Sequence, residues 1–216
     1  AGIFALRMLG LFLVLPVFAL EAARLPGGND PALVGLAMGI YGLTQAVMQV
    51  PLGLASDRVG RKKIIVIGLI VFALGSVVAA LAGSVQMLIV GRAIQGAGAV
   101  SAAVTALLAD LTRDEVRTKG MALVGISIAA MFALSLVVAP PLAGAIGLGG
   151  LFWITALLAV AGIAVVLWWT PAEPMQHTDV PRGRLADVWL HPNLWRLDLG
   201  VFVLHTVQMA MWVVVP

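Results

Sequence analysis

Long apolar segments alternate with short polar segments along the whole chain. A helix needs about 20 apolar residues to cross the hydrocarbon core of a bilayer. That length predicts six complete spans, at roughly residues 3–20, 32–55, 64–82, 85–109, 120–146 and 151–169, followed by a seventh span over residues 197–216. No segment has the alternation typical of a strand. The pattern therefore predicts an all-α membrane protein.

Prolines and glycines predict irregularities within these spans. Pro16 predicts a kink in the first span, and Pro140 with Pro141 predicts that the last turns of the fifth span are broken. The glycine-rich stretch 147–150 predicts a tight turn between the fifth and sixth spans. Three parts follow: an N-terminal six-helix transmembrane half (1–169), an inter-half linker (170–196) and helix 7 (197–216).

Basic residues concentrate in alternate loops. Only Arg24 lies in the loops on one side. The loops on the other side contain Arg58, Arg61, Lys62, Lys63, Arg113, Arg117, Lys119, Arg182, Arg184 and Arg196. By the positive-inside rule the second set is cytoplasmic. We therefore expect a multi-pass protein of the cell membrane, with a cytoplasmic N-terminus, a cytoplasmic linker and the lipid bilayer as its surroundings.

Composition excludes several classes of protein. The chain is 62% hydrophobic and only 11% charged, whereas a soluble domain is about a quarter charged. It has no cysteine, so disulfides and thiolate metal sites are excluded. The net charge of +3 lies in short loops, so nucleic acid is not an expected partner. No phosphate-binding loop, zinc-protease motif or pair of catalytic carboxylates is present, so we expect no enzyme, cofactor or metal.

Two arginines fall inside predicted spans. Arg92 lies in the fourth span with Gln95 one turn later, and Arg7 lies in the first span nearer the cytoplasm. A charge at the centre of a membrane helix costs about 2.5–3.5 kcal/mol on insertion scales, which favours a cavity or partner for each arginine. The alternative is an arginine that extends its head group to the membrane surface. Their related positions also suggest an inverted repeat of three helices plus three.

The second predicted span carries two stripes of residues. Tyr41, Gln45 and Gln49 share one face, where they either line a central cavity or hydrogen-bond between helices. Gly35, Gly39 and Gly42 form a second stripe, which is expected to pack against another helix.

Titratable groups at membrane depth are scarce. The six complete spans contain no Asp or Glu within the bilayer, and His205 in the seventh span is the only histidine at that depth. His205 is therefore a candidate for proton exchange, although a structural role is the alternative. Asp110 closes the fourth span on the cytoplasmic side, level with Arg61, which makes a charged pair between them plausible.

Residues 53–63 (GLASDRVGRKK) resemble the signature of the major facilitator superfamily between its second and third helices. The matching residues are Gly53, Asp57, Arg58, Gly60, Arg61 and Lys62. Residues 88–98 resemble the family's helix 4 motif, with Arg92 at its arginine. The helix 5 antiporter motif is kept only at Pro140 and Gly144, and two of its glycines are replaced. Other stretches, such as GRAIQGAGAV and LLADLTRDE, resemble YajR-type transporters in the drug:proton antiporter branch.

The resemblance implies a twelve-helix fold in two halves, of which this chain is the N-terminal half plus helix 7. It also implies a bacterial inner membrane protein that exports small amphipathic compounds in exchange for protons by alternating access. Asp57, Arg61 and Asp110 would form a charge network that holds the two halves together in one state, so the missing C-terminal half is an expected partner. The alternatives are a facilitator-type importer of a metabolite, a non-transporting scaffold or pore, and, for this chain alone, an inactive half-transporter.

Overall fold

The computed structural model describes residues 2–98, 100–171 and 191–214, with the backbone alone at 205 and 208–214. The chain forms two compact units, Ala1–Pro174 and Met175–Pro216. The described part of the second unit contains one helix, α9 (Pro192–Val214). No described residue is in a strand, so the all-helical class predicted from the sequence is confirmed.

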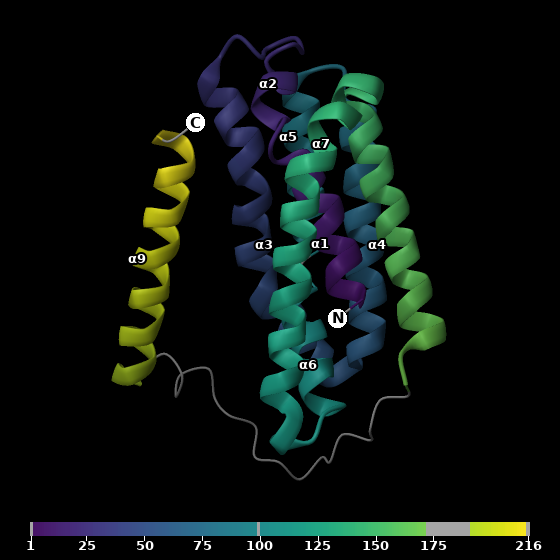
Figure 1. The fold of residues 1–216 in the computed structure, drawn as a ribbon, viewed down its shortest axis with the longest axis vertical. Helices are drawn as coiled ribbons and strands as arrows, with labels where there is room; N and C mark the ends of the chain where they lie inside the picture. Colours follow the sequence, from purple (N-terminus) through teal and green to yellow (C-terminus); the bar gives the residue numbers. More distant parts are fainter. Residues whose placement is uncertain (1, 99, 172–190, 215–216) are drawn as a thin grey trace. The chain divides into compact units, whose positions relative to one another are not determined.

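The first unit runs back and forth between two ends (Figure 1). Its elements are α1 (Gly2–Val14), α2 (Phe18–Ala22), α3 (Pro31–Val59), α4 (Arg61–Ala80), α5 (Val85–Ala97), α6 (Ser101–Asp110), α7 (Asp114–Ala164) and a π-helical turn η1 (Val165–Trp169). Within the described residues, four stretches are long and apolar enough to cross a membrane: Pro31–Val59, Arg61–Ala80, Val85–Asp110 and Asp114–Trp169. We call the end where α3 meets α4 and α6 meets α7 the basic end, because it carries most of the lysines and arginines.

The first and fourth predicted spans are each broken in two. The first breaks around Pro16, which confirms the predicted kink: the ring removes a backbone donor and crowds the preceding turn. The fourth span, predicted as one helix, is divided into α5 and α6. At this break the backbone of α4 lies so close that a Cβ on Gly98 would stand 2.4 Å from the carbonyl oxygen of Gly68.

Helix α7 contains two predicted spans, and the prediction about its prolines is wrong. The helix continues through Pro140 and Pro141, because proline fixes φ near a helical value and membrane helices accommodate the lost donors by local adjustment. The backbone instead leaves the helical region at Gly147, with φ 66° and ψ −178°. Glycine alone adopts this conformation readily. There the chain reverses and runs back (Figure 1), giving a first arm (114–146) and a second arm (148–164).

The predicted basic loop between the second and third spans shrinks to one residue. Helix α3 extends to Val59 and α4 begins at Arg61, with Gly60 between them at φ 113°. Two other boundaries also move: α7 begins at Asp114, not residue 120, and α9 begins at Pro192, so the last predicted linker residues are helical. The rest of the predicted linker, residues 172–190, lies outside the described residues.

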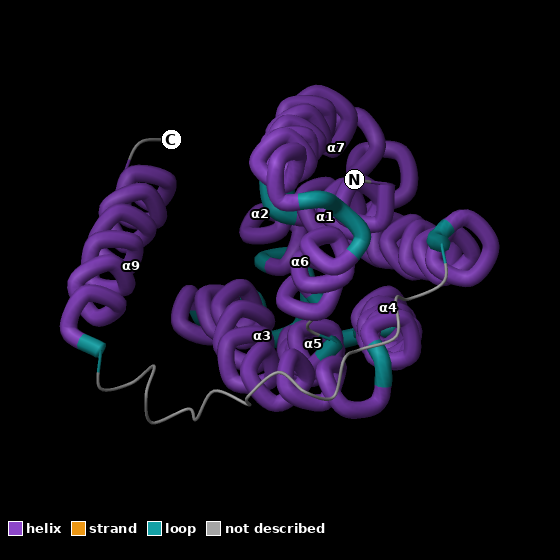
Figure 2. Tube along the Cα trace, turned by 90° about the horizontal axis from the view of Figure 1, so that it is seen from below, coloured by secondary structure: helices purple, strands orange, loops and turns teal. Residues whose placement is uncertain are grey.

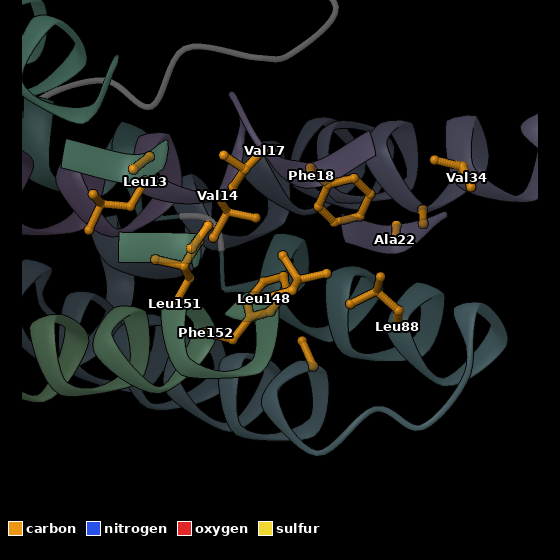
Figure 3. Close-up of a cluster of buried hydrophobic side chains, with 14 of the residues drawn as sticks. Leu13, Val14, Val17, Phe18, Ala22, Val34, Leu88, Leu148, Leu151 and Phe152 are labelled. Atoms are coloured by element: carbon orange, nitrogen blue, oxygen red, sulfur yellow. The ribbon is translucent and has the colours of Figure 1, made fainter. Parts of the chain in front are cut away.

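The two larger apolar clusters of the first unit are separated by buried polar residues on α1, α4, α5 and α7. The first cluster includes Val14, Phe18, Leu88, Leu151 and Phe152 (Figure 3). The second cluster, toward the basic end, includes Phe4, Ile65, Leu69, Val104 and Val166. Buried polar side chains fall between members of the two clusters: Arg7 on α1, Ser76 on α4, Arg92 and Gln95 on α5, and Thr155 on α7.

Close helix packing holds this arrangement in place. Helix α1 packs chiefly against α7, where the Thr155 hydroxyl donates to the Gly10 carbonyl oxygen at 2.9 Å. Helix α5 packs against both α3 and α4, as the end-on view shows (Figure 2). A Cβ on Gly75 of α4 would stand 2.3 Å from the backbone nitrogen of Gln95, so α4 and α5 meet backbone to backbone. Small residues allow such contact between membrane helices.

Candidate functional site

Arg92 is buried in the middle of the helix bundle. Its side chain is 1% exposed. Its Nη1 donates to Oε1 of Gln95 at 2.8 Å, and its Nε donates to the Ala37 carbonyl oxygen at 3.4 Å. Its guanidinium carbon lies 4.6 Å from the centre of the Tyr41 ring and 5.5 Å from that of Phe18. Arg92 therefore turns toward the bundle interior and does not extend to the membrane surface.

Gln95 is fixed in turn by α4. Its Nε2 donates to the Ser76 hydroxyl at 2.8 Å, and that hydroxyl donates to the Phe72 carbonyl oxygen at 2.8 Å. Both ends of the Gln95 amide are thus engaged, one by Arg92 and one by Ser76. This chain of contacts leaves the Arg92 guanidinium little freedom to rotate.

Arg7 is buried by residues from three other helices. It is 2% exposed. Its Nη1 donates to the Ser101 hydroxyl at 2.8 Å, and its Nη2 donates to the Tyr41 hydroxyl at 3.0 Å and to Oε1 of Gln45 at 3.4 Å. The Phe72 ring centre lies 5.5 Å from its guanidinium carbon. Arg7 also does not extend to the surface, contrary to the alternative drawn from its sequence position.

Tyr41 joins the two arginines. Its hydroxyl accepts from Arg7, and its ring lies against the Arg92 guanidinium. We call the connected set the arginine layer, and its members are Arg7, Tyr41, Gln45, Ser76, Arg92, Gln95 and Ser101. The layer connects α1, α3, α4, α5 and α6 between the two apolar clusters.

Among the residues that the structure describes, no carboxylate pairs with either arginine of this layer. The acidic residues between 2 and 171 lie at or near helix ends: Glu21, Asp30, Asp57, Asp110, Asp114 and Glu115. Every hydrogen-bond acceptor described for Arg7 and Arg92 is neutral. Two positive charges are therefore buried together with only hydroxyl, amide, carbonyl and aromatic partners.

The two stripes on α3 have different surroundings. Tyr41 is buried, whereas Gln45 and Gln49 are half-buried. The Gln49 Oε1 atom is enclosed and has no hydrogen-bond partner among the described residues. The glycine stripe was predicted to pack against a helix, and this is wrong for the described part of the chain: Gly35, Gly39 and Gly42 are exposed, and a Cβ on any of them would meet nothing within 4 Å.

A second polar site lies at the basic end and is centred on Arg61. Its Nε pairs with Oδ2 of Asp110 at 3.0 Å, its Nη1 donates to the Ser56 hydroxyl at 2.8 Å, and it also forms an ion pair with Asp57. The Arg61 side chain is only 15% exposed, whereas Asp57 is 53% and Asp110 38% exposed. We call Asp57, Arg61 and Asp110 the inner charge cluster, which ties the ends of α3, α4 and α6 together.

The other residues of the 53–63 signature surround this cluster. Gly53 faces α6, and a Cβ there would stand 3.6 Å from that of Ala102. Gly60 supplies the turn, and Arg58 is exposed. Lys62 donates from Nζ to the carbonyl oxygen of Thr170, which connects the start of α4 to the residue after η1.

Three candidate residues from the sequence analysis belong to neither site in the described part of the chain. Pro140 and Gly144 are exposed on the first arm of α7, and a Cβ on Gly144 would meet nothing within 4 Å. His205 belongs to α9, and its side chain lies outside the described residues.

Sequence reasoning did not single out Ser56, Ser76 or Ser101, although each binds a candidate residue. The sequence signal that could have identified these serines is a small polar residue inside an apolar span.

Comparison with known proteins gives consistent results. The family profile described as Major Facilitator Superfamily matches residues 1–216. Inner membrane transport protein YajR of Escherichia coli (strain K12) is 47% identical over 218 residues, which cover 99% of this chain and 48% of that protein. Tetracycline resistance protein, class B, of Escherichia coli is 31% identical over 169 residues, covering 76% of this chain and 41% of that protein.

Solved structures agree on the fold. A peptide transporter, POT, crystallised with alafosfalin, covers 100% of this chain with a TM-score of 0.71 at 18% identity, and the match covers 45% of that transporter. A bacterial homologue of the human lysosomal transporter Spinster gives a TM-score of 0.59 over 92% of this chain and 49% of its own.

The chain thus spans about half the length of the curated relatives it matches. Those relatives are named as transport proteins, which supports the expectation that it is not an enzyme, and the resemblance to YajR-type transporters is confirmed. The chain belongs to the Major Facilitator Superfamily.

Proposed function

We propose that this chain is the N-terminal half, plus helix 7, of a proton-coupled exporter of small amphipathic compounds in a bacterial inner membrane. The arginine layer is the observation that carries the proposal. A helical scaffold has no need for two arginines buried at 1% and 2% exposure without a carboxylate, whereas charged residues inside membrane bundles usually mark substrate or ion pathways. Arg92, fixed by Gln95 and Ser76, would contact substrate or respond to its binding.

The inner charge cluster would set the equilibrium between the two access states. Asp57 and Asp110 are more exposed than Arg61, so a second half can contact them while Arg61 remains in place. Such a network would favour the state in which the basic end is closed. Its contribution to the free-energy difference between the two states would be about 1–3 kcal/mol, the range typical of coupling between sites. The similarity to a tetracycline resistance protein supports placing the chain in the drug:proton antiporter branch.

The test is reconstitution of the full-length protein into proteoliposomes with a panel of amphipathic compounds. A proton-coupled carrier gives saturable uptake that an imposed pH gradient drives and nigericin abolishes, and it also shows counterflow of labelled against unlabelled compound. A pore gives neither saturation nor counterflow, and that result contradicts the proposal. The same assay on the 216-residue chain alone tests whether it is an inactive half-transporter.

A facilitator-type importer is the second candidate, and one observation favours it. Residues 2–171 contain no carboxylate between their helix ends that could carry a proton. A facilitator would show saturation and counterflow in the same proteoliposomes, with an unchanged rate when nigericin collapses the pH gradient.

A further inference from the structure

The arginine layer retains unused hydrogen-bond donors beside its two buried charges. Arg7 Nε is enclosed without a partner among the described residues. Arg92 uses Nη1 and Nε, and no described residue accepts a hydrogen bond from its Nη2. A guanidinium carries five N–H donors and no acceptor, so the enclosed Arg7 Nε requires an acceptor that the described residues do not supply, and Arg92 Nη2 remains available to the same acceptor.

The sign of the charge restricts what that acceptor is. Both arginines are positive, and their described partners, Ser101, Tyr41, Gln45, Ala37 and Gln95, contribute only neutral atoms. An anionic oxygen pair matches a guanidinium in charge and geometry and binds more strongly than a neutral acceptor. A cation would be repelled at short range by both arginines in this low-dielectric region.

The surroundings indicate that the anion has an apolar body. The rings of Phe18, Tyr41 and Phe72 lie within 5.5 Å of one or other guanidinium. The half-buried residues Gln45 and Ser101, both bonded to Arg7, give the layer a polar edge toward its surroundings. One charged head group among donors, with aromatic rings beside it, is the lining expected for an amphipathic ligand.

We propose that the arginine layer binds amphipathic organic monocarboxylates, with the carboxylate accepting from Arg7 and Arg92. This inference rests on the proposed transport function and narrows its substrates from amphipathic compounds in general to anionic ones. Arg92, held by Gln95 and Ser76, is the fixed donor, and Arg7 is the second donor at the polar edge. Tyr41 positions the two arginines relative to each other.

Three probes that differ in charge test the proposal on the unsubstituted full-length protein in nonionic detergent. They are 4-phenylbutanoate, its uncharged amide 4-phenylbutanamide and the cationic 4-phenylbutylamine. Binding is measured by the shift in thermal unfolding temperature and by titration calorimetry. We expect saturable binding of the carboxylate, at least tenfold weaker binding of the amide and no binding of the amine. Equal binding of all three, or no saturable binding of the carboxylate, overturns the proposal.

Single-residue variants test whether 4-phenylbutanoate binds at the arginine layer. Arg7→Gln and Arg92→Gln should each weaken 4-phenylbutanoate at least tenfold. Arg24→Gln, which removes an arginine with a 69% exposed side chain, should leave it unchanged. Equal losses in all three variants overturn the proposal, as does displacement of the probe by phosphatidylglycerol, which would make this a lipid site. The three-probe series decides the matter if a variant does not fold.

Binding and transport fail separately. Carboxylate-selective binding without proton-driven uptake contradicts the proposed exporter and leaves this inference standing. Proton-driven uptake of amphipathic cations, with no preference for the carboxylate, contradicts this inference and leaves the proposed exporter standing.

Discussion

Arg61 shows how one side chain at the basic end joins three helices. It contacts Ser56 and Asp57 on α3 and Asp110 on α6, while it belongs to the first turn of α4. An isolated exposed ion pair contributes about 0–1 kcal/mol to the free energy of unfolding. We therefore expect this cluster to hold the ends of α3, α4 and α6 in position and to add little to the stability of the fold.

Asp110→Asn tests this role. The change keeps the shape of the side chain but removes the charge that pairs with Arg61, so we expect transport by the full-length protein to fall at least fivefold. The free energy of unfolding should change by less than about 1 kcal/mol, because the pair is partly exposed. Initial rates in proteoliposomes and thermal unfolding in detergent measure the two effects.

Asp114→Asn is the matched control, since Asp114 is 82% exposed and pairs with Arg117 one turn away on the same helix. An equal loss of transport in both variants would show that the cluster has no special role.

The second prediction for a single residue concerns Arg92→Gln. Removing a buried charge that lacks a carboxylate partner relieves a desolvation cost, so the protein should still fold, while transport should be lost. Uptake into proteoliposomes and the unfolding temperature measure this, with Arg24→Gln as the control. Transport at the rate of the unsubstituted protein would contradict a role for Arg92 in binding or coupling.

Sequence patterns predicted individual residues better than their partners. The spacing of Arg92 and Gln95 along one helix was visible in the sequence, and so was the motif containing Arg61. The contacts of Arg7 with Tyr41 and Ser101 join positions 34 and 94 residues apart, which no local period reveals. The same limit applies to Lys62 and Thr170, 108 residues apart.

At the scale of elements, glycines decide which helix faces meet. A Cβ on Gly96 of α5 would stand 2.0 Å from the Thr44 hydroxyl and 2.2 Å from the Tyr41 carbonyl oxygen on α3. Gly35, on α3 itself, would place a Cβ in open space. Sequence reasoning could count these glycines but could not tell which stripe faced a neighbour.

Gly96→Ala should therefore destabilise the bundle, and Gly35→Ala should not. Overpacking at a tight contact costs about 1–3 kcal/mol, whereas alanine in an exposed helix is favoured over glycine by up to about 1 kcal/mol. Thermal unfolding of both variants in the same detergent gives the comparison. A lower unfolding temperature for Gly35→Ala than for Gly96→Ala would contradict the packing described above.

Span positions were well predicted, but boundaries and breaks were not. The predicted spans coincide with helical stretches of residues 2–171, although the first and fourth are each divided into two helices. The ends of α3 and α7 were missed, since Asp57, Arg58 and the residues from Asp114 onward are charged yet helical. Pro140 and Pro141 were expected to break a helix that continues through them.

At the scale of the whole molecule, the expected arrangement across the membrane can be tested because the chain has no cysteine. Single substitutions at exposed positions then give one reactive thiol each. Asn29→Cys lies between α2 and α3, and Thr118→Cys lies in the second turn of α7, at the opposite end of the first unit (Figure 1).

In intact cells, a membrane-impermeant maleimide should label Asn29→Cys. Thr118→Cys should react only after permeabilisation, because the positive-inside rule predicts a cytoplasmic position for the end that is rich in lysine and arginine. Labelling of Thr118→Cys in intact cells would reverse the orientation of the whole chain.

The chain reverses at the single residue Gly147, so this residue is the only hinge between the two arms of α7. With a single residue as the joint, the two arms stay together at that end, and any separation between them must grow toward Asp114 and Trp169. Spin labels at Thr118→Cys and Leu167→Cys, both on exposed residues, would report such spreading as a broadened distance distribution. Labels placed beside the joint would report a constant one.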